Sequence, residues 1–410
     1  MRCPDDRDDR VVITGLGCVS ALGTNKDDFW TALLEGRSGI RPMTKVPDGC
    51  RSPWMAAEAR EFDANLHFEP RRIKLLDPFA QMAVVAAREA IAHSGLEFTD
   101  SMSERTAIIL GTGLAGDTTV NESYKRIYGP SGGRVHPVTI PRAMANAAVS
   151  NIAIDNNIRG PGFAVSSACA SAGHAIGVAY LLVRHGLVSA AIAGGSDSCL
   201  NLGTLRAWEA LRVMAPDTCR PFSRDRKGMV LGEGAAVLVL ESMRSARGRG
   251  TDVLAELCGF GMSSDAVNLV SPSQDGAARA IKAALSDAKM NPNQIDYVNA
   301  HGSGTIANDL METRALHSVF GMHAKNLAVS GTKSMHGHAM GAAGALEAVA
   351  TVLAIHSGMV PPTVNYIGPD GDCDLDYIPN EARECRINAA LSNSFAFGGL
   401  NAVLAFARFD

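Results

Sequence analysis

The chain has 410 residues, a length that fits two or three domains or one large duplicated domain. Hydrophobic residues make up 46% of it and charged residues 20%, which is typical of a protein with a substantial core and excludes a small disulfide scaffold and general disorder. The 38 basic and 42 acidic residues give a formal net charge of −4, so no overall positive field attracts nucleic acid or an anionic membrane. We therefore expect neither nucleic acid nor a membrane among its partners.

The cysteines and the apolar stretches indicate a cytoplasmic chain. Nine cysteines, an odd number, are scattered along the sequence without a C-x-x-C pair, which is typical of reduced thiols and predicts no metal site. The N-terminus is charged where a signal peptide would be apolar, so we expect a solvated tail over residues 1–10. Residues Ala339 to Ile355 are apolar but contain Glu347 and fall short of the ~20 apolar residues of a membrane span. We expect a buried core helix there.

Short β-branched runs alternate with alanine-rich helical segments, which predicts an α/β protein whose strands are covered on both faces. Two series of strands are expected. The first series is Val11–Thr14, Thr106–Leu110, Ala190–Ala193 and Ala235–Leu240. The second series is Val253–Cys258, Tyr297–Ala300, Ile387–Leu391 and Ala402–Phe406. An alanine-rich helix is expected in each series, at Phe79–His93 and at Gly276–Ala288.

The two series follow the same order. Each has a strand that leads to a glycine turn, at Gly15-Leu16-Gly17 in the first and at Gly259-Phe260-Gly261 in the second. Each also has a long helix that begins just after a residue with reactive chemistry, Cys169 in one and His338 in the other. This repeated order predicts an internal duplication.

The expected halves are residues 1–250 and 251–410, and we expect Arg244–Arg249 to form a charged, glycine-containing linker near the boundary. The first half is longer by roughly Asn121–Arg142, a stretch rich in Gly, Pro and Arg that we expect to form an insertion.

Cys169 lies in a run of small residues that passes from a β-like segment into a helical pattern. Its sulfur is therefore expected at or near a helix N-terminus, where the helix dipole and the free backbone N–H groups favour the nucleophilic thiolate. Small neighbours leave room for a substrate carbonyl. A buried, inert cysteine is the alternative, and the local sequence does not separate the two.

Two histidine motifs favour the catalytic alternative. His301 ends a predicted strand in Asn299-Ala300-His301-Gly302-Ser303-Gly304-Thr305, and His338 opens a helix after Lys333-Ser334-Met335-His336-Gly337. If the halves are duplicated, both strand ends and both helix starts face one cleft, where a thiol and two imidazoles meet. His174 lies inside its helix, and we expect it to be a hydrogen-bonding core residue. His185, near the end of that helix, is expected to interact with the helix dipole.

The run Gly111-Thr112-Gly113-Leu114-Ala115-Gly116 fits the G-x-G-x-x-G pattern of dinucleotide sites. No clear acidic residue closes a following strand, and Pro130 and Gly132-Gly133 interrupt the unit, so this interpretation is disfavoured.

With these motifs the chain resembles the elongating β-ketoacyl-acyl carrier protein synthases of fatty acid and polyketide synthesis. The resemblance runs from Val11 to Val403 and rests on separate motifs in the same order: the Cys169 run, Arg220-Pro221-Phe222-Ser223-Arg224-Asp225-Arg226 with Gly232-Glu233-Gly234, the His301 run, the Lys333–His338 run and Asn393–Asn401. It implies a thiolase-like fold of duplicated α-β-α-β-α layers with two mixed five-stranded sheets. It also implies Cys169, His301 and His338 as the catalytic set, supported by an ion pair between Lys333 and Glu312.

The resemblance further implies a reaction. Cys169 takes the acyl chain from a carrier-protein thioester, and backbone N–H groups of Cys169 and Phe397 stabilise the oxyanion. His301 and His338 hold the carbonyl of a malonyl thioester, whose decarboxylation gives the enolate that attacks the acyl group. The substrates travel on the phosphopantetheine of the carrier protein, and no other cofactor is expected. The residues implied to line or gate the acyl pocket are Leu114, Phe395, Ala396 and Phe397.

Three positions depart from the pattern of the housekeeping enzymes, namely His336 and Leu400 where threonine is usual and Ala396 where glycine is usual. These variants resemble condensing enzymes of specialised pathways, such as type II polyketide or polyene synthesis or the acyl chains of signalling lipids. A side chain at 396 removes access to positive φ and is expected to stiffen the loop that carries Phe397. We expect His336 to influence which substrate is chosen, and the alternative is that it only packs in the core.

Basic residues match the positions where the family presents charge to an acidic carrier protein, and a solvated charge cluster is the alternative for each one. They are Arg71, Arg72, Lys74, Arg134, Arg206 and Arg212. A thiolase-like fold also implies a dimer, either of like chains or with a ketosynthase-like chain-length factor.

Two other functions remain open at this level. A non-catalytic chain-length or scaffold subunit would lack the nucleophile, and Cys169 argues against it. A degradative thiolase needs a second catalytic cysteine in a glycine-rich turn near the C-terminus, a setting that Cys373 and Cys385 do not have.

Overall fold

The computed structural model describes residues 10–45, 54–130 and 132–409. Cys3, Cys50 and the expected tail over residues 1–9 lie outside these ranges. The strands are β1 Val11–Ser20, β2 Arg41–Pro42, β3 Met55–Ala56, β4 Thr106–Gly111, β5 Gly162–Val165, β6 Ala190–Asp197, β7 Gly234–Ser242, β8 Ala255–Ser264, β9 Tyr297–Asn299, β10 Ala328–Ser330, β11 Met359–Val360, β12 Arg383–Glu384, β13 Ala389–Ala396 and β14 Leu400–Ala407. The helices are α1 Lys26–Leu34, α2 Pro70–Ile73, α3 Pro78–Ser94, α4 Asp100–Glu104, α5 Asp117–Tyr128, α6 Thr139–Ala143, α7 Ala147–Asn156, α8 Ser171–Arg184, α9 Leu202–Ala210, α10 Met243–Arg249, α11 Gln274–Asp287, α12 Ile306–Phe320, α13 Lys333–His336 and α14 Ala343–Ser357.

The sheet repeats one strand order in the two halves of the chain. The first half runs β5-β4-β6-β7-β1 and the second runs β10-β9-β13-β14-β8, so each strand of one half has a counterpart at the same place in the other. In both halves, the first three strands of this order are parallel to one another. The fourth strand is antiparallel to the third, and the fifth is antiparallel to the fourth. The expected duplication is therefore present in the topology. The boundary expected at residue 250 falls between α10 and β8, and it stays a prediction. The linker expected at Arg244–Arg249 is corrected, because this segment belongs to helix α10, which packs on β1 and β7.

One expectation about the sheets is corrected. Instead of two separate five-stranded sheets, the strands form a single ten-stranded sheet, because residues Val11–Ile13 of β1 pair with Ala255–Leu257 of β8. The two halves are thus joined by main-chain hydrogen bonds at their edges as well as by helix packing.

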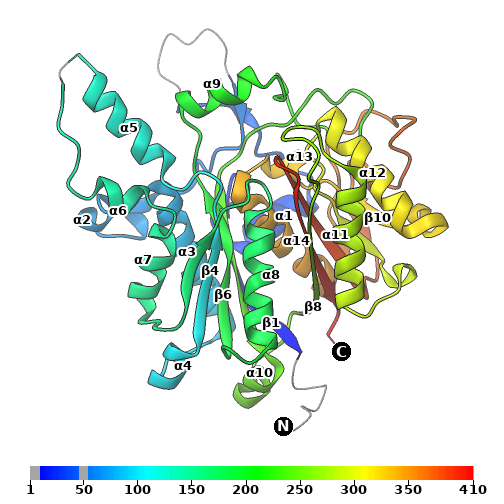
Figure 1. Ribbon diagram of the computed structural model, residues 1–410, viewed down its shortest axis with the longest axis horizontal. Helices are drawn as coiled ribbons and strands as arrows, with labels where there is room; N and C mark the ends of the chain where they lie inside the picture. Colours follow the sequence, from blue (N-terminus) through cyan, green and yellow to red (C-terminus); the bar gives the residue numbers. More distant parts are fainter. Residues whose placement is uncertain (1–9, 46–53, 131, 410) are drawn as a thin grey trace.

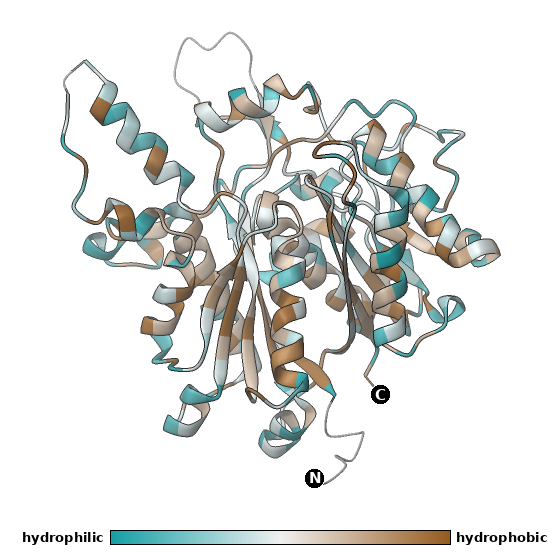
Figure 2. Cartoon of the chain, in the orientation of Figure 1, coloured by the Kyte–Doolittle hydropathy of each residue, from teal (hydrophilic) through white to brown (hydrophobic). Residues whose placement is uncertain are grey.

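The helices complete five layers, and Figure 1 shows α8 and α14 between the two halves of the sheet. Helices α3 and α7 cover the outer face of the first half, and α11 covers that of the second. The largest buried cluster lies around α8 and α14. In Figure 2, brown apolar segments mark the strands of the large sheet and the central helices. The fold expected from the sequence is confirmed at this level.

The central helix α14 shows why the most apolar stretch of the chain is a core element. Residues Met340–Ser357 form one helical stretch long and apolar enough to cross a membrane, and 83% of it is buried inside the protein. Its alanines and glycines allow close approach to α8 and to strands of both halves. The expectation of a buried core helix is confirmed.

The glycines at the start of each half do not form turns, and the expectation for them is corrected. Gly15 and Gly17 lie inside β1, and Gly259 and Gly261 lie inside β8. A Cβ on Gly17 would lie 2.1 Å from the carbonyl oxygen of Ala86 in α3, and one on Gly261 would lie 2.1 Å from that of Ala280 in α11. Each pair of glycines therefore lets a helix lie directly on its strand.

The remaining differences from the sequence expectations are small. Two short strands of the ten-stranded sheet, β5 and β10, were not expected, because four and three residues give no readable alternation. The two-residue strands β2, β3, β11 and β12, which form two small separate sheets, were not expected either. The stretch expected as an insertion forms α5 and α6, and Figure 1 shows α5 projecting from the body of the molecule.

Candidate active site

A cavity of about 160 Å³ brings together residues of both halves. Cys169 comes from the first half, and His301 and His338 come from the second. The residues lining it are Cys169, Val213, Met229, Val270, Ser271, Pro272, His301, Ser303, Thr305, Ala307, Asn308, His338, Phe395, Ala396 and Phe397. The three side chains expected to meet therefore do meet, and Cys169 is the one cysteine among these described lining residues.

Cys169 lies on a tight connection between β5 and α8. The chain turns at Ala168, whose φ is +50°, and the hydroxyl of Ser171 donates to the Ala168 carbonyl oxygen at 2.6 Å. The sulfur is thus held two residues before the first residue of α8, as expected, and the residue is 3% exposed. A positive φ at a non-glycine residue next to a nucleophile is typical of strain kept for function.

The charge state expected for this thiol is corrected by its burial. Burial raises the pKa of Cys169 to about 11, and the charge of Lys333 and the backbone N–H groups of Phe397 and Cys169 lower it only in part. The resting side chain is therefore a thiol, because loss of solvation outweighs the effect of the helix end. The backbone N–H groups of Phe397 and Cys169, which are the expected oxyanion-hole donors, lie close enough to the sulfur to lower its pKa.

The two histidines face each other with ring centroids 5.5 Å apart and an interplanar angle of 81°. The backbone N–H of Met340 donates to Nδ1 of His338 at 3.0 Å, and the Lys333 ammonium lies 3.4 Å from Nδ1 of His301. An ammonium group and a backbone N–H can only donate, so Nδ1 accepts in both rings and Nε2 carries the proton. Burial and the Lys333 charge hold the pKa of both rings well below 6.5, so both are neutral donors.

The ion pair expected between Lys333 and Glu312 is corrected. The ammonium of Lys333 pairs with the carboxylate of Glu347 in α14, and both side chains are fully buried. Lys333 also donates to the carbonyl oxygen of His301 at 2.6 Å. Burial raises the pKa of Glu347 to about 7 even with Lys333 beside it. The signal for this pair in the sequence was the lone carboxylate in the apolar stretch of α14.

Glu312 in α12 has a different role. Its carboxylate accepts from the backbone N–H groups of His301 and Gly302 at 2.8 and 2.9 Å and from the side-chain amide of Asn393 at 3.0 Å. Burial raises its pKa, and these hydrogen bonds and the Lys333 charge offset that rise. Glu312 therefore supports His301 through the backbone that carries it.

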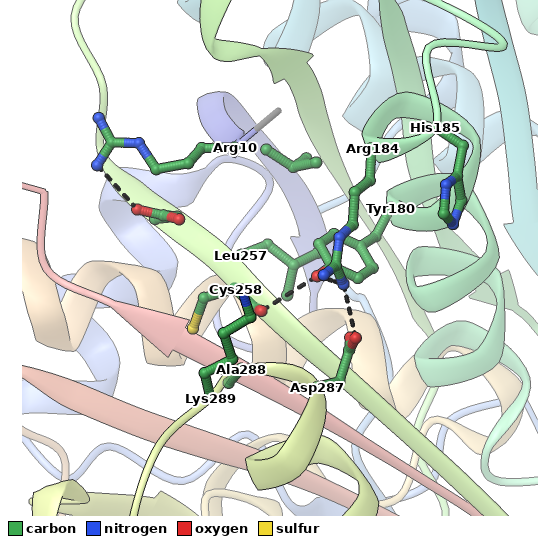
Figure 3. A pocket seen from close by; sticks show the side chains of 11 residues that line it. Arg10, Tyr180, Arg184, His185, Leu257, Cys258, Asp287, Ala288 and Lys289 are labelled. Atoms are coloured by element: carbon green, nitrogen blue, oxygen red, sulfur yellow. Dashed lines mark hydrogen bonds and ion pairs between the residues drawn. The ribbon is translucent and has the colours of Figure 1, made fainter. Parts of the chain in front are cut away.

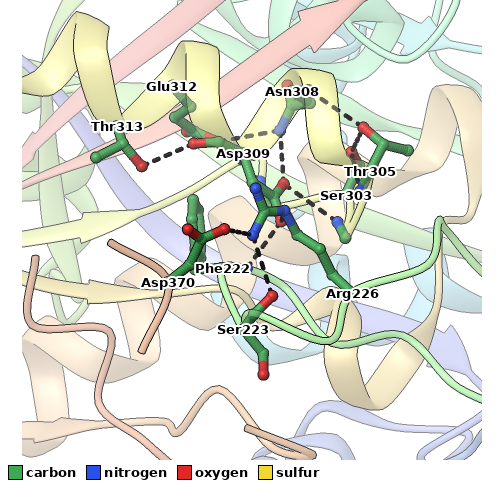
Figure 4. A network of polar contacts seen from close by, with 12 residues as sticks. Phe222, Ser223, Arg226, Ser303, Thr305, Asn308, Asp309, Glu312, Thr313 and Asp370 are labelled. Atoms are coloured by element: carbon green, nitrogen blue, oxygen red, sulfur yellow. Dashed lines mark hydrogen bonds and ion pairs between the residues drawn. The ribbon is translucent and has the colours of Figure 1, made fainter. Parts of the chain in front are cut away.

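A second buried carboxylate on α12 extends this support, as Figure 4 shows. Asp309 accepts from the backbone N–H groups of Phe222 and Gly304 at 2.8 and 3.2 Å and lies 3.7 Å from the Arg226 guanidinium. Arg226 in turn pairs with Asp370. These contacts tie the Arg220–Arg226 segment of the first half to the turn after His301, a connection that the sequence did not reveal.

Phe397 begins a glycine turn at the mouth of the cavity. Gly398 and Gly399 have φ of +85° and +71°, and the Asp265 N–H donates to the carbonyl oxygen of Gly399 at 2.8 Å. The ring of Phe397 contacts Trp208 of α9 at a centroid distance of 5.7 Å, a partner that the sequence did not indicate. Phe395 lies 6.2 Å from the His301 ring, and Ala396 ends β13 in an extended conformation.

Leu114 is the one expected pocket residue outside the cavity. Its side chain is 39% exposed, and the backbone N–H groups of Gly113 and Leu114 donate to the buried carboxylate of Asp197. Gly113 therefore serves a protein carboxylate, and Gly111 and Gly116 allow close contact with the start of α8 and with Ala143, because a Cβ on them would lie 2.3 and 2.5 Å from backbone atoms there. A cofactor phosphate is not needed to explain them.

His336 is a packing residue in this structure. It is fully buried, its Nε2 lies 3.1 Å from the hydroxyl of Thr332, and its ring is 6.1 Å from that of Phe29. It does not line the cavity. Burial lowers its pKa to about 3, so the ring stays neutral. His174 forms a hydrogen bond as expected, since its Nδ1 lies 2.8 Å from the Ser167 hydroxyl. His185 is the C-cap residue of α8, and its interaction with the helix dipole stays a prediction.

The basic residues expected to dock a partner do not form one patch on this chain. They lie on or beside α2 (Arg71, Arg72, Lys74), between α5 and α6 (Arg134) and on or after α9 (Arg206, Arg212). Figure 1 shows α2 and α9 well apart. Arg72 pairs with Asp155, and Arg206 pairs with Glu209 at 2.6 Å.

A second cavity, of about 390 Å³, opens near the junction of β1 and β8 and shares no residue with the Cys169 cavity. Two ion pairs lie in it, as the dashed lines of Figure 3 mark: Arg10 lies 3.3 Å from Glu256 and Arg184 lies 2.6 Å from Asp287. The hydroxyl of Tyr180 donates to the Cys258 carbonyl oxygen at 3.1 Å. These contacts hold the two halves together at the end away from α9.

Comparison with known proteins agrees with this geometry. The family models "Beta-ketoacyl synthase, N-terminal domain" and "Beta-ketoacyl synthase, C-terminal domain" match residues 8–246 and 254–367. Nodulation protein E of Rhizobium sp. (strain N33) is 46% identical, over 97% of this chain and 99% of that protein. The 3-oxoacyl-[acyl-carrier-protein] synthase 2 of Coxiella burnetii (strain RSA 493 / Nine Mile phase I) is 41% identical, over 97% and 98%. The solved structure of the ishigamide ketosynthase/chain length factor has a TM-score of 0.91 at 36% identity and covers 98% of this chain and 99% of its own. The chain therefore belongs to the β-ketoacyl synthase family and is an acyl-chain-elongating enzyme of that family.

Proposed function

We propose that the chain condenses an acyl group held on Cys169 with a malonyl group delivered on an acyl carrier protein, with loss of carbon dioxide. The observation that carries this proposal is the cavity lined by one thiol and two neutral imidazoles whose Nδ1 atoms are already occupied. The names of the relatives, which include an acyl-carrier-protein synthase, support the carrier protein as the source of both substrates.

In the first step the sulfur of Cys169 attacks the carbonyl carbon of the acyl thioester. The oxyanion that forms is stabilised by the backbone N–H groups of Cys169 and Phe397, and one such donor is worth roughly 3–4 kcal/mol where it has been measured. The C–S bond to the carrier then breaks, and the carrier thiol leaves with the proton of the cysteine. The acyl group is now on Cys169.

In the second step a malonyl thioester occupies the site, and Nε2–H groups of His301 and His338 donate to its carbonyl oxygen. The bond to the carboxylate breaks, carbon dioxide leaves, and the electron pair forms an enolate that the two donors stabilise. The enolate carbon attacks the acyl carbonyl, the Cys169 sulfur leaves, and one proton from solvent restores the thiol. The product is a β-ketoacyl chain on the carrier.

The buried charges keep the two donors in place. Lys333 holds the carbonyl oxygen and Nδ1 side of His301, and Glu312 holds the backbone of His301 and Gly302. Neutral imidazoles with a fixed N–H direction suit a carbonyl oxygen that gains charge during decarboxylation. The steps need no metal or organic cofactor beyond the phosphopantetheine arm of the carrier. In the described ranges, no group of three or more His, Cys, Asp or Glu side chains is arranged to hold a metal ion.

We also propose where the partners bind. Arg206 and Arg212 flank Trp208 and precede the lining residue Val213, so a carrier protein that reaches the cavity passes α9. The edge strand β5 is partly exposed and includes Phe163, which is 42% exposed. This edge supports a dimer, either of two like chains or with a chain-length-factor partner of the kind named in the ishigamide structure.

The setting is proposed on the same basis. Free thiols at all seven cysteines of the described ranges support a cytoplasmic enzyme. His336, Ala396 and the similarity to Nodulation protein E support a specialised pathway. Residues 1–250 and 251–410 are proposed as the two halves, which fits the repeated strand order.

The test is acyl transfer from a panel of acyl carrier proteins, followed by the mass of the intact chain. The native chain and Cys219→Ala should gain the mass of the acyl group, and Cys169→Ala should gain none. Cys219 is a matched control because it is buried beside the His301 turn, where its thiol contacts the Ser303 carbonyl oxygen at 3.4 Å, and it does not line the cavity.

Two outcomes would contradict the proposal. A native chain that is never acylated would indicate a non-catalytic scaffold subunit. Efficient turnover of acyl-coenzyme A with free coenzyme A, without a carrier protein, would indicate a degradative thiolase.

A further inference from the structure

The carboxylate of Asp197 lies fully buried at the end of β6 and is used by none of the steps above. It accepts four hydrogen bonds. The hydroxyl of Thr112 and the backbone N–H groups of Gly113 and Leu114 donate at 2.8, 2.7 and 3.1 Å, and the backbone N–H of Gly341 donates at 2.6 Å. Three donors belong to the loop after β4 in the first half, and the fourth belongs to the second half.

The donor from the second half adjoins a catalytic histidine. Gly341 follows Met340, whose N–H occupies Nδ1 of His338 and so fixes which ring nitrogen carries the proton. The bond from Gly341 to Asp197 therefore holds the short segment from His338 to Gly341 that sets both the place and the tautomer of the ring.

The other three donors lead to the nucleophile. The carbonyl oxygen of Thr112 lies 3.3 Å from the hydroxyl oxygen of Ser171, whose shorter bond of 2.6 Å goes to the Ala168 carbonyl oxygen, and Ser171 is the first residue of α8, next to the turn that carries Cys169. The two segments touch backbone to backbone, because a Cβ on Gly341 would lie 2.3 Å from the nitrogen of Gly113. One carboxylate thus joins the Cys169 side of the site to the His338 side.

We propose that Asp197 is a positioning residue that sets His338 against Cys169 across the joint between the two halves. This inference rests on the proposed role of His338 as a donor in decarboxylation. It predicts that loss of Asp197 impairs the step that uses His338 more than the step that uses only Cys169 and the oxyanion hole.

The charge of Asp197 increases the expected difference between its effects on decarboxylation and on self-acylation. Its negative charge is one of the influences that raise the pKa of Cys169, so its removal makes the thiol easier to ionise. Self-acylation should therefore stay near the native rate, and the pH profile of Cys169 alkylation should move to lower pH. A general loss of structure would slow both steps together.

Asp77 offers a matched control. It is also a fully buried carboxylate of the first half whose pKa is raised to about 6, as is that of Asp197, and it accepts from the backbone N–H groups of Phe79 and Thr119 at 3.1 and 2.8 Å. Both donors lie in the first half, so Asp77→Ala removes a comparable group without touching the joint.

The experiment measures malonyl decarboxylation and Cys169 self-acylation separately, with carrier-linked substrates, in the full chain. In Asp197→Ala we expect decarboxylation to fall about 10-fold to 100-fold, the range for partners behind a functional residue, and self-acylation to change by less than about 3-fold. Asp197→Asn, which keeps one acceptor oxygen and the size of the side chain, should show the same split at reduced size. Asp77→Ala should alter the two steps by equal factors.

The proposal is overturned if both steps fall equally in the Asp197 variants, or if Asp77→Ala gives the same split. His338→Ala, measured alongside, separates this failure from failure of the proposed function. Full decarboxylation in His338→Ala would contradict the role of that imidazole, whatever the Asp197 variants do.

Discussion

The first and second halves of the chain have the same strand order and differ in the side chains placed at corresponding points. At the start of the central helix, the first half has Cys169 before α8 and the second has His338 before α14. At the end of the corresponding inner strand, β4 leads to Gly111 and β9 leads to His301. A duplicated scaffold therefore fixes where chemistry can be placed, and each half supplies a different part of it.

The halves also differ in their buried charge. In the second half, Lys333 lies beside the His301 ring, and three buried carboxylates hold Lys333 and the backbone around His301, whereas Cys169 has small neighbours. The carboxylates belong to Glu347, Glu312 and Asp309. Burial raises the pKa of Cys169 and lowers the pKa of both histidines, so all three reacting groups are neutral at rest. We infer that the second half uses several buried charges to orient two neutral donors, while the first half holds its thiol by backbone geometry and by the single carboxylate of Asp197.

The largest effect is expected from a substitution that impairs the step assigned to the second half and spares the step assigned to the first. His338→Ala should slow malonyl decarboxylation by on the order of 10²–10³-fold, the usual cost of a lost donor to a developing oxyanion, and should leave Cys169 self-acylation in place. Release of carbon dioxide and the mass of the acylated chain are the two measurements. His174→Ala is the control, because His174 lies on α8 of the first half and does not line the cavity. Equal loss of both steps would contradict separate roles.

The next effect concerns the stability of the second half. Lys333→Met leaves the fully buried carboxylate of Glu347 without its partner, and we expect the free energy of unfolding in denaturant to fall by about 3 kcal/mol. The double variant Lys333→Met with Glu347→Leu should recover much of this loss and none of the activity. Better recovery with Glu312→Leu in place of Glu347→Leu would show that the pair is assigned wrongly.

A third prediction concerns how the stability of the chain depends on pH through the buried histidine His336. The folded chain holds the pKa of His336 at about 3, against 6.5 for an exposed histidine, so the unfolded chain binds the proton first as pH falls. This contribution to stability is complete above pH 6.5 and is lost as pH falls from 6.5 towards 3. His336→Thr should therefore reduce the loss of Tm between pH 7.5 and pH 5, with acyl selectivity unchanged. An altered selectivity would restore the substrate role first expected for this residue.

The smallest effect is expected at the surface. Charge reversal at Arg206 or Arg212 should raise the KM for the carrier protein by about threefold to fivefold per site and leave kcat unchanged, because single exposed charges contribute little. Arg105→Glu is the control, since Arg105 follows α4 at the end of the molecule opposite α9 in Figure 1. An equal rise in KM for Arg105→Glu would indicate a general charge effect without a docking site at α9.

Much of the site could be predicted because its signals are local. Cys169, His301 and His338 each lie in a short motif of small residues, and the repeated order of elements indicates that the motifs converge. The partner of Lys333 was predicted wrongly, because Glu312 and Glu347 both follow a helical pattern and only the packing of α14 decides which carboxylate reaches the ammonium. Leu114 was assigned to the pocket for a similar reason, since a loop sequence does not fix the direction of a side chain.

The sequence by itself determined the α/β class, the duplicated order of strands and helices, and the choice of one thiol and two imidazoles as candidate catalytic groups, because periodicity and short motifs encode these features. Only the tertiary structure decided the joining of the two sheets through β1 and β8, the neutral state of the thiol, the Lys333–Glu347 pair and the Asp197 joint. Each of these depends on contacts between residues far apart in the chain and on the loss of solvent around them. Such energies exist only once the core has closed.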